Sequence, residues 1–136
     1  MEEAWHRARE TAHRDREQSR EAQQLRRARS DALLLELRTR WPAVFTTPVP
    51  LAIGIDGEIR DTLRQEAAAA GTAAPPWSVI KGAIAWWTRQ NGYREALATA
   101  SHRIGLDGQP AGEITERDRQ HASERLVERA ARRRPA

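Results

Sequence analysis

The sequence lacks cysteine altogether, which excludes disulfides and thiolate metal sites. It has no run of about 18 apolar residues, so it contains no candidate for a membrane span. The N-terminus is charged from Glu2 onward, which is unlike a secretory signal. These absences suit the reducing cytoplasm, where we expect the protein to work, and they indicate no membrane partner.

Residues that could form a catalytic centre or a metal site are also scarce. The histidines show no metal-ligand spacing, and His6 and His13 form only a weak pair on a charged helix. Gly54 and Gly57 lack the lysine and the loop length of a phosphate-binding loop. No serine has a histidine partner at a position typical of a nucleophilic pair. We therefore expect no enzyme, no cofactor and no metal ion.

Lysine is nearly absent, because 22 of the 23 basic residues are arginine. The net charge is +4, and the excess lies at the two ends, since residues 41–112 carry six basic and six acidic side chains. Arginine offers a planar donor fork that suits phosphate and can stack on bases. A GC-rich genome, which favours arginine codons, would produce the same bias. The composition therefore indicates a polyanionic partner without requiring one.

With 136 residues the chain can hold one domain with arms. Residues 1–29 contain no proline or glycine and are dense in charged residues, which predicts a long helical arm. A heptad seam that starts at Trp5 fails after two turns, so we expect no coiled coil. The chain is compatible with a monomer, and the sequence leaves its oligomeric state open. The arm is either a solubilising extension or a helix that lies along a polyanion. Residues 30–131 form the predicted domain, and residues 132–136 form a basic tail.

The apolar pattern of the domain predicts a mainly α fold with short β elements, in the α+β class. A helix over residues 31–41 is either separate from the arm or continuous with it, and Pro42 ends it. Residues 51–55 are a short apolar run after a proline, which predicts a buried strand. Asp107 and Gly108 separate two extended runs, which is typical of a hairpin turn.

The remaining helices are predicted over residues 56–71, 77–90, 93–100 and 115–131. Either Pro76 or Ser78 begins the second of these, and Trp87 lies on its apolar stripe, where we expect core packing. Asn91 is a good N-cap for the third helix, and a capping box at residues 115–118 opens the last one. The residues of the last helix that should face inward are Ala122, Leu126, Val127 and Ala130.

The break at Asn91 and Gly92 is the best candidate for a binding site. It exposes a helix N-terminus, whose unpaired amides would attract an anion. Tyr93 lies among basic groups, as in proteins that bind single-stranded nucleic acid, although its spacing fits a core position equally well. The candidate nucleic-acid-binding residues are Lys81, Arg89, Asn91, Gly92, Tyr93, Arg94, His102 and Arg103.

Five motifs occur in the order RWPAVF, PLAIGI, IKGAIAWWTRQNGY, HRIGLDGQPAGEIT and QHASERL. Together they resemble the FinO domain of the ProQ/FinO family of bacterial RNA chaperones, over residues 37–126. The resemblance implies a mostly helical domain that binds structured RNA, typically a terminator-like stem with a single-stranded 3′ tail. It also implies a role in post-transcriptional regulation by small or antisense RNA. The long charged N-terminal helix and the short tail resemble the plasmid FinO branch.

Three residues can be carried over from the family by position. Lys81, Tyr93 and Arg103 stand where the family uses a basic residue, a tyrosine and an arginine to hold RNA. The helix start at residues 91–94 resembles the family's cap for the RNA 3′ end. His121 matches a histidine of the last helix, which we expect to be structural.

The chain departs from the family pattern at two positions. Ala52 and Ala85 stand where basic residues are common, so two phosphate contacts are absent and Arg89 and the arm would have to replace them. Two other functions are compatible with the sequence. One is a helical protein-interaction module whose arm docks on an acidic partner, and the other is duplex-DNA binding, for which a recognition helix with base-reading side chains is lacking.

Overall fold

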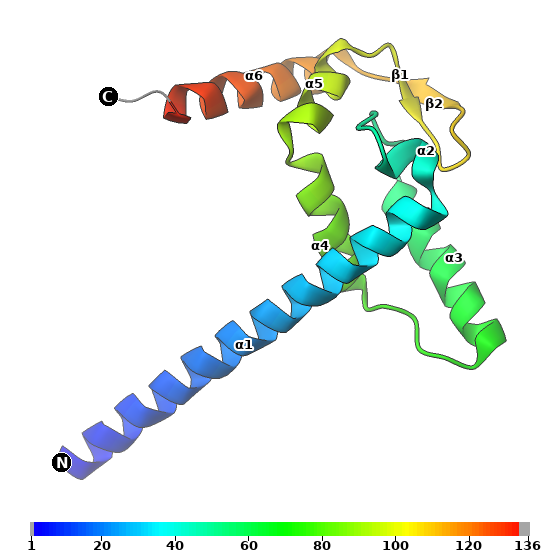
Figure 1. Ribbon diagram of the computed structural model, residues 1–136. Helices are drawn as coiled ribbons and strands as arrows, with labels where there is room; N and C mark the ends of the chain where they lie inside the picture. The colour runs from blue at the N-terminus through cyan, green and yellow to red at the C-terminus, as the bar shows by residue number, and fades with distance from the viewer. Residues whose placement is uncertain (1, 134–136) are drawn as a thin grey trace.

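The computed structural model describes residues 2–133, and helices dominate this range (Figure 1). The strands of the described range form one two-stranded antiparallel sheet. The elements in chain order are α1 (Glu2–Arg40), α2 (Pro42–Phe45), α3 (Ile55–Ala70), α4 (Trp77–Thr88), α5 (Asn91–Thr99), β1 (His102–Ile104), β2 (Pro110–Glu113) and α6 (Glu116–Arg133). The mainly α fold with short β elements is therefore confirmed. Of the predicted tail, Arg132 and Arg133 belong to α6, and the rest lies outside the described residues.

α1 is a single helix of 39 residues, so the predicted arm and the apolar segment after it are continuous. Proline and glycine are absent before Pro42, and nothing else in the sequence would interrupt the helix. The described residues up to Arg29 are exposed, and Ser30 is the first buried one. In Figure 1 the first half of α1 extends away from the other elements. The arm is therefore a direct continuation of a helix that is anchored in the core.

The hydrophobic core lies where α1, α2, α3 and α4 meet. Phe45 is fully buried, and its ring meets the Trp87 ring edge-on, with the centroids 5.9 Å apart. Trp87 is thus confirmed as a core residue, whereas the neighbouring Trp86 is 48% exposed. The other buried members of the core are Leu33, Leu34, Leu37, Val44, Leu51, Ile55, Ile59, Val79, Ile80, Ala83 and Tyr93.

α1 and α4 cross at close range because two small residues face each other. The Ser30 hydroxyl donates a hydrogen bond of 2.9 Å to the Val79 carbonyl in the interior. A Cβ atom on Gly82 would lie only 2.6 Å from the Ser30 Oγ atom, so glycine is what allows the two helices to approach. The crossing fixes the direction in which the arm leaves the domain.

The prediction of a buried strand over residues 51–55 is wrong. Leu51 alone pairs with another segment, as an isolated parallel bridge to Ile104 with hydrogen bonds of 2.7 and 3.0 Å on either side. Ile53 is 79% exposed, and Gly54 has a φ of 84°, a left-handed conformation that ends the extended run. The apolar residues are therefore shared between a one-residue bridge and the start of α3.

The hairpin is confirmed, since β1 and β2 pair antiparallel with His102 opposite Glu113. The Gly108 amide donates to the Gly105 carbonyl at 2.9 Å, and Gly108 has a φ of 80°. The predicted Asp-Gly pair therefore lies in the turn, with glycine in the conformation that favours it. The hairpin docks on residues 50–52 through the bridge described above.

The helix starts differ in part from the expectation. α4 begins directly after Pro76, which is its extended N-cap residue. Gln90 is the N-cap residue of α5, and Asn91 already belongs to the helix, so the prediction of Asn91 as the cap is wrong. α4 ends at Thr88, two residues earlier than expected, so the break between the helices lies at residues 89–90. The cap of α6 is confirmed, because the Asp118 amide donates to the Thr115 hydroxyl oxygen at 3.1 Å.

α6 packs against α5 along a narrow face. Ala122 is buried and Leu126 is half-buried, as predicted. Val127 is 69% exposed and Ala130 is also exposed, so their predicted inward positions are wrong. α5 is only 9 residues long and covers a single stripe of its partner, which leaves the other positions open. His121, expected to be structural, is likewise exposed rather than packed in the core.

Candidate nucleic-acid interface

Five arginines gather where the start of α5 packs against the second half of α6. They surround a hollow of about 290 Å³. Two of them come from residues 89–94, which we call the α4–α5 joint. The other three come from α6, where the spacing of i, i+4 and i+7 puts the side chains on one face. We define the arginine cluster as Arg89, Arg94, Arg125, Arg129 and Arg132.

The arginine cluster holds more positive charge than its surroundings neutralise. Its hollow contains one carboxylate, Glu128, which lies 3.9 Å from an Arg125 nitrogen and 3.8 Å from an Arg132 nitrogen. Burial lowers the pKa of Arg94, and the charges of the neighbouring arginines lower it further, which Glu128 offsets only in part. A bound anion would relieve this repulsion, so the cluster has the electrostatics of an anion site.

The start of α5 adds backbone donors to the same place. The Arg94 amide donates to the Gln90 carbonyl at 3.1 Å, and the amides before it belong to the first turn, where a helix has no acceptor of its own. The Arg89 carbonyl accepts a hydrogen bond of 3.0 Å from the Arg129 guanidinium, which ties α6 to the joint. The helix dipole adds positive potential at this end. The helix start at residues 91–94, which resembles the family's cap for the RNA 3′ end, therefore lies beside the arginine cluster.

A groove of about 520 Å³ between α1 and α4 continues the basic surface. We call it the α1–α4 groove. Its charged lining consists of three arginines and one acid, and none of the three arginines forms an ion pair with a described residue. Arg89 lines both this groove and the hollow of the arginine cluster, so the two are contiguous. The charged residues of the groove are Arg26, Arg27, Asp31 and Arg89.

Tyr93 and Arg103 meet at the backbone of Leu51. The Tyr93 hydroxyl accepts the Leu51 amide hydrogen at 3.2 Å, and the Arg103 guanidinium donates to the Leu51 carbonyl at 3.0 Å. The same guanidinium pairs with Asp118 of α6 at 2.8 Å, and its side chain is only 11% exposed. Tyr93 is 6% exposed, so its ring is not open to a stacking base. Of the two positions that its spacing allowed, it occupies the one in the core. Both residues hold the loop before α3 in place.

The other candidate residues lie at the surface. Lys81 is exposed on α4, two turns before Arg89, with its Nζ atom 5.3 Å from the centroid of the Trp77 ring. His102 is exposed on the hairpin, and its Nδ1 atom lies 3.0 Å from the Ser101 hydroxyl. Asn91 is half-buried and Gly92 is exposed, so these two belong to the α4–α5 joint with Arg89 and Arg94.

Five basic residues of this surface were not among the sequence candidates. The α6 arginines could have been found from their helical spacing, because positions four and three residues apart share a face. The two α1 arginines carried no such signal, since arginines are scattered all around the arm. The residues that the structure adds are Arg26, Arg27, Arg125, Arg129 and Arg132.

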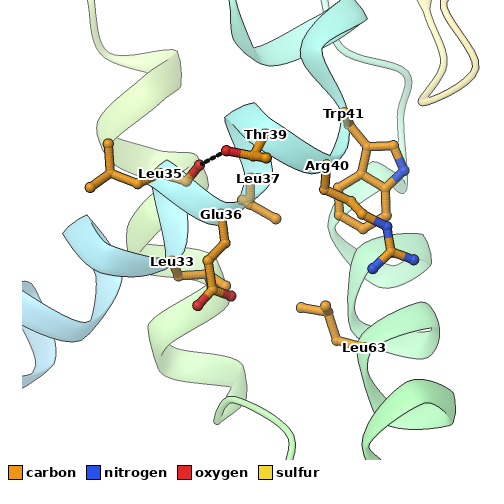
Figure 2. Close-up of a pocket in the computed structure, with 8 residues that line it drawn as sticks. All are labelled: Leu33, Leu35, Glu36, Leu37, Thr39, Arg40, Trp41 and Leu63. Atoms are coloured by element: carbon orange, nitrogen blue, oxygen red, sulfur yellow. Dashed lines mark hydrogen bonds between the residues drawn. The ribbon is translucent and has the colours of Figure 1, made fainter.

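A further hollow, of about 550 Å³, lies between the end of α1 and α3 (Figure 2). Its walls are mostly aliphatic, with Trp41 at one side, and Arg40 there is paired with Glu66 of α3. An apolar lining and a paired arginine offer little to a polyanion. Residues 2–133 contain no group of three or more potential metal ligands. None of the helices described is long and apolar enough to cross a membrane.

The ProQ/FINO family model matches residues 27–136, which is most of the chain, and the chain therefore belongs to this family. The match begins at residue 27, in the second half of α1 and just before the first buried residue, so most of the exposed arm lies outside it. Among curated proteins, no sequence matches this chain.

A solved structure has the same fold. It is a FinO-like RNA chaperone from Neisseria meningitidis MC58, with a TM-score of 0.58 and 24% sequence identity to this chain. The match covers 69% of this chain and 89% of that protein. The fold that the sequence motifs implied is therefore confirmed.

Proposed function

We propose that this chain is an RNA-binding protein without catalytic activity, which acts as an RNA chaperone in post-transcriptional regulation by small or antisense RNA. The observation that carries the proposal is the contiguous basic surface of the arginine cluster and the α1–α4 groove. Membership of the ProQ/FINO family and the description of the structural neighbour as an RNA chaperone support the same function.

A nucleic-acid backbone suits this surface because its negative charges are numerous and regularly spaced. The planar fork of arginine donates two parallel hydrogen bonds to a phosphate, and five such forks share one hollow with a single carboxylate. Duplex RNA is recognised mostly by its shape and its phosphates. We therefore expect the sequence of a bound stem to have little influence on affinity.

The RNA that we propose is a terminator-like stem-loop with a single-stranded 3′ tail. The family resemblance supports this substrate, and the two contiguous hollows offer separate surfaces to a stem and a tail. Tyr93 and Arg103 have a positioning role, because both hold the backbone of Leu51. The proposed contacts among the sequence candidates are the side chains of Lys81, Arg89, Arg94 and His102 and the backbone of Asn91 and Gly92.

A binding titration of the full chain tests the proposal. The probes are a fluorescently labelled terminator hairpin with its 3′ tail and the same hairpin without the tail, each at several salt concentrations. We expect tighter binding of the tailed RNA and a log affinity that falls linearly with log salt. Absence of binding at low salt would overturn the RNA-binding proposal, and equal affinity for both probes would overturn the role of the tail.

Two competitors separate RNA binding from the alternatives. A DNA duplex of the stem sequence and a poly-glutamate peptide are added to the preformed RNA complex. We expect unlabelled tailed hairpin to displace the probe at much lower concentration than either competitor. Displacement by poly-glutamate at the same concentration as RNA would favour a protein-interaction module with an acidic partner.

A further inference from the structure

Trp86 borders the α1–α4 groove. The side chain is 48% exposed, although a large apolar ring gains most from burial. Trp86 forms no ring or cation pair with a described residue. The other four tryptophans each meet a cation or a second ring, in the pairs Trp5–Arg9, Trp41–Arg40, Trp77–Arg60 and Trp87–Phe45.

The surroundings of this ring are those of a nucleic-acid groove. Three arginines without carboxylate partners line the same groove as Trp86, against one aspartate. Proteins hold single-stranded nucleic acid by stacking bases on aromatic rings while basic groups follow the backbone. The bases of a duplex are stacked on one another and are closed to such a ring. Tyr93, the only tyrosine of the chain, is buried, so Trp86 is the aromatic ring that this surface offers.

We propose that the α1–α4 groove binds an unpaired stretch of RNA, with one base stacked on Trp86 and the flanking phosphates held by Arg26, Arg27 and Arg89. The inference rests on the proposed RNA-binding function and specifies where its single-stranded tail binds. It also makes α1 part of the site, because this helix contributes two of the three arginines. The arginine cluster is contiguous with this groove through Arg89, so RNA that is bound in the groove continues onto the cluster.

The test compares four full-length proteins on the tailed and the blunt hairpin. They are the wild type, Trp86→Ala, Trp86→Phe and a control, Leu35→Ala, which truncates an exposed apolar residue at the hollow of Figure 2. We expect Trp86→Ala to weaken the tailed hairpin by roughly 5- to 150-fold, as loss of one stacked base implies. The affinity of Trp86→Ala for the blunt hairpin should equal that of the wild type. Trp86→Phe should retain most of the affinity for the tailed hairpin, and Leu35→Ala should bind both hairpins as the wild type does.

A spectroscopic signal makes the result independent of affinity. A 2-aminopurine base in the tail should lose emission when it stacks on the wild type or on Trp86→Phe, and should keep it on Trp86→Ala. Unchanged emission along the whole tail at saturation would overturn the inference, as would equal losses of affinity for both hairpins. If Trp86→Ala binds the tailed RNA as tightly as the wild type does, the inference is overturned but the proposed RNA-binding function is not. A wild type that binds neither RNA would overturn the proposed function as well.

Discussion

Some side chains of the candidate site face the proposed RNA, and others hold the backbone in place. The Leu51 amide donates to the Tyr93 hydroxyl of α5, and the Leu51 carbonyl accepts from the Arg103 guanidinium of β1. The same guanidinium donates to Asp118 of α6. The Leu51 backbone therefore joins α5 to β1, and Arg103 links both to α6. A substitution at Arg103 will act on stability and on RNA binding together, because removing it leaves a part-buried carboxylate without its partner.

Tyr93→Phe isolates the supporting role. The change keeps the buried ring and removes the oxygen that accepts the Leu51 amide hydrogen. We expect the free energy of unfolding to fall by about 1–3 kcal/mol, because a buried amide loses its acceptor. Urea denaturation followed by circular dichroism measures this. An unchanged midpoint and slope would show that the hydrogen bond contributes nothing to the fold.

Arg129→Ala tests a contact in the arginine cluster. The change removes a guanidinium from the hollow, and the loss of a charge-assisted hydrogen bond to phosphate should cost roughly 1.5–3 kcal/mol of binding free energy for the hairpin. Arg64→Ala is the matched control, since Arg64 is exposed on α3 outside both basic hollows. Fluorescence anisotropy measures both. Equal affinities of the two variants would mean that Arg129 does not contact the RNA.

Side-chain hydrogen bonds could be predicted from the sequence where the two partners are close to each other in the chain. Thr115 and Asp118 are three apart, and the helix cap between them is confirmed. Tyr93 and Leu51 are 42 residues apart, and the spacing of Tyr93 in its own helix was compatible with either a core or a surface position. A contact of that separation depends on how three helices pack, which local propensity does not contain.

At the scale of elements, the crossing of α1 and α4 determines the shape of the groove. Gly82→Ala places a methyl group where the Ser30 hydroxyl oxygen would lie 2.6 Å away. We expect the free energy of unfolding to fall by about 1–3 kcal/mol, as in other overpacked interiors. The α1–α4 groove should widen, and the affinity for tailed RNA should fall with it. Thermal and urea denaturation measure the first effect.

Two further variants act as controls for this crossing. Gly57→Ala makes the same chemical change in α3, where the added Cβ would meet one side-chain atom at 4.0 Å, and it should not destabilise the protein. In a Ser30→Ala background, Gly82→Ala should cost less than in the wild type, because the nearest atom is gone. The same cost in both backgrounds would mean that Ser30 is not the obstacle.

Helices were predictable and the single predicted core strand was not, for a physical reason. A period of 3.6 residues repeats several times within a helix, whereas the five residues 51–55 offer too few positions to separate a strand from a bridge followed by a helix. Gly54, in a left-handed conformation, decides the outcome. The hairpin was predictable because the Asp107-Gly108 turn is encoded locally. The continuity of α1 follows from the absence of a breaker before Pro42.

At the scale of the whole molecule, the two basic ends of the sequence converge on one place. The charge counts located the excess at the ends of the chain, and the fold brings Arg26 and Arg27 of α1 to one side of Arg89. The arginines of α6 lie on its other side. Figure 1 shows α1 and α6 extending from the body on the same side of the molecule. Composition could predict a polyanionic partner, but the convergence depends on helix packing alone.

The salt dependence of RNA binding tests this convergence. We expect the combined change of Arg26→Ala and Arg27→Ala to flatten the slope of log affinity against log salt by roughly 0.7–0.9 for each lost phosphate contact. Deletion of residues 1–29 should flatten it at least as much, and any excess measures contacts of the free arm. Titrations between low and physiological salt give the slopes. If neither change alters the slope, the arm serves only as a spacer.

The length of α1 has a hydrodynamic consequence. A helix of 39 residues is about 58 Å long, whereas a compact chain of this size has a radius of gyration of about 14 Å. Such elongation raises the frictional coefficient, so a monomer should leave a gel-filtration column ahead of globular standards of its mass and imitate a dimer. Sedimentation equilibrium, which does not depend on shape, should return 15.4 kDa for the monomer that we expect. A mass twice as large would mean that the chain forms a dimer.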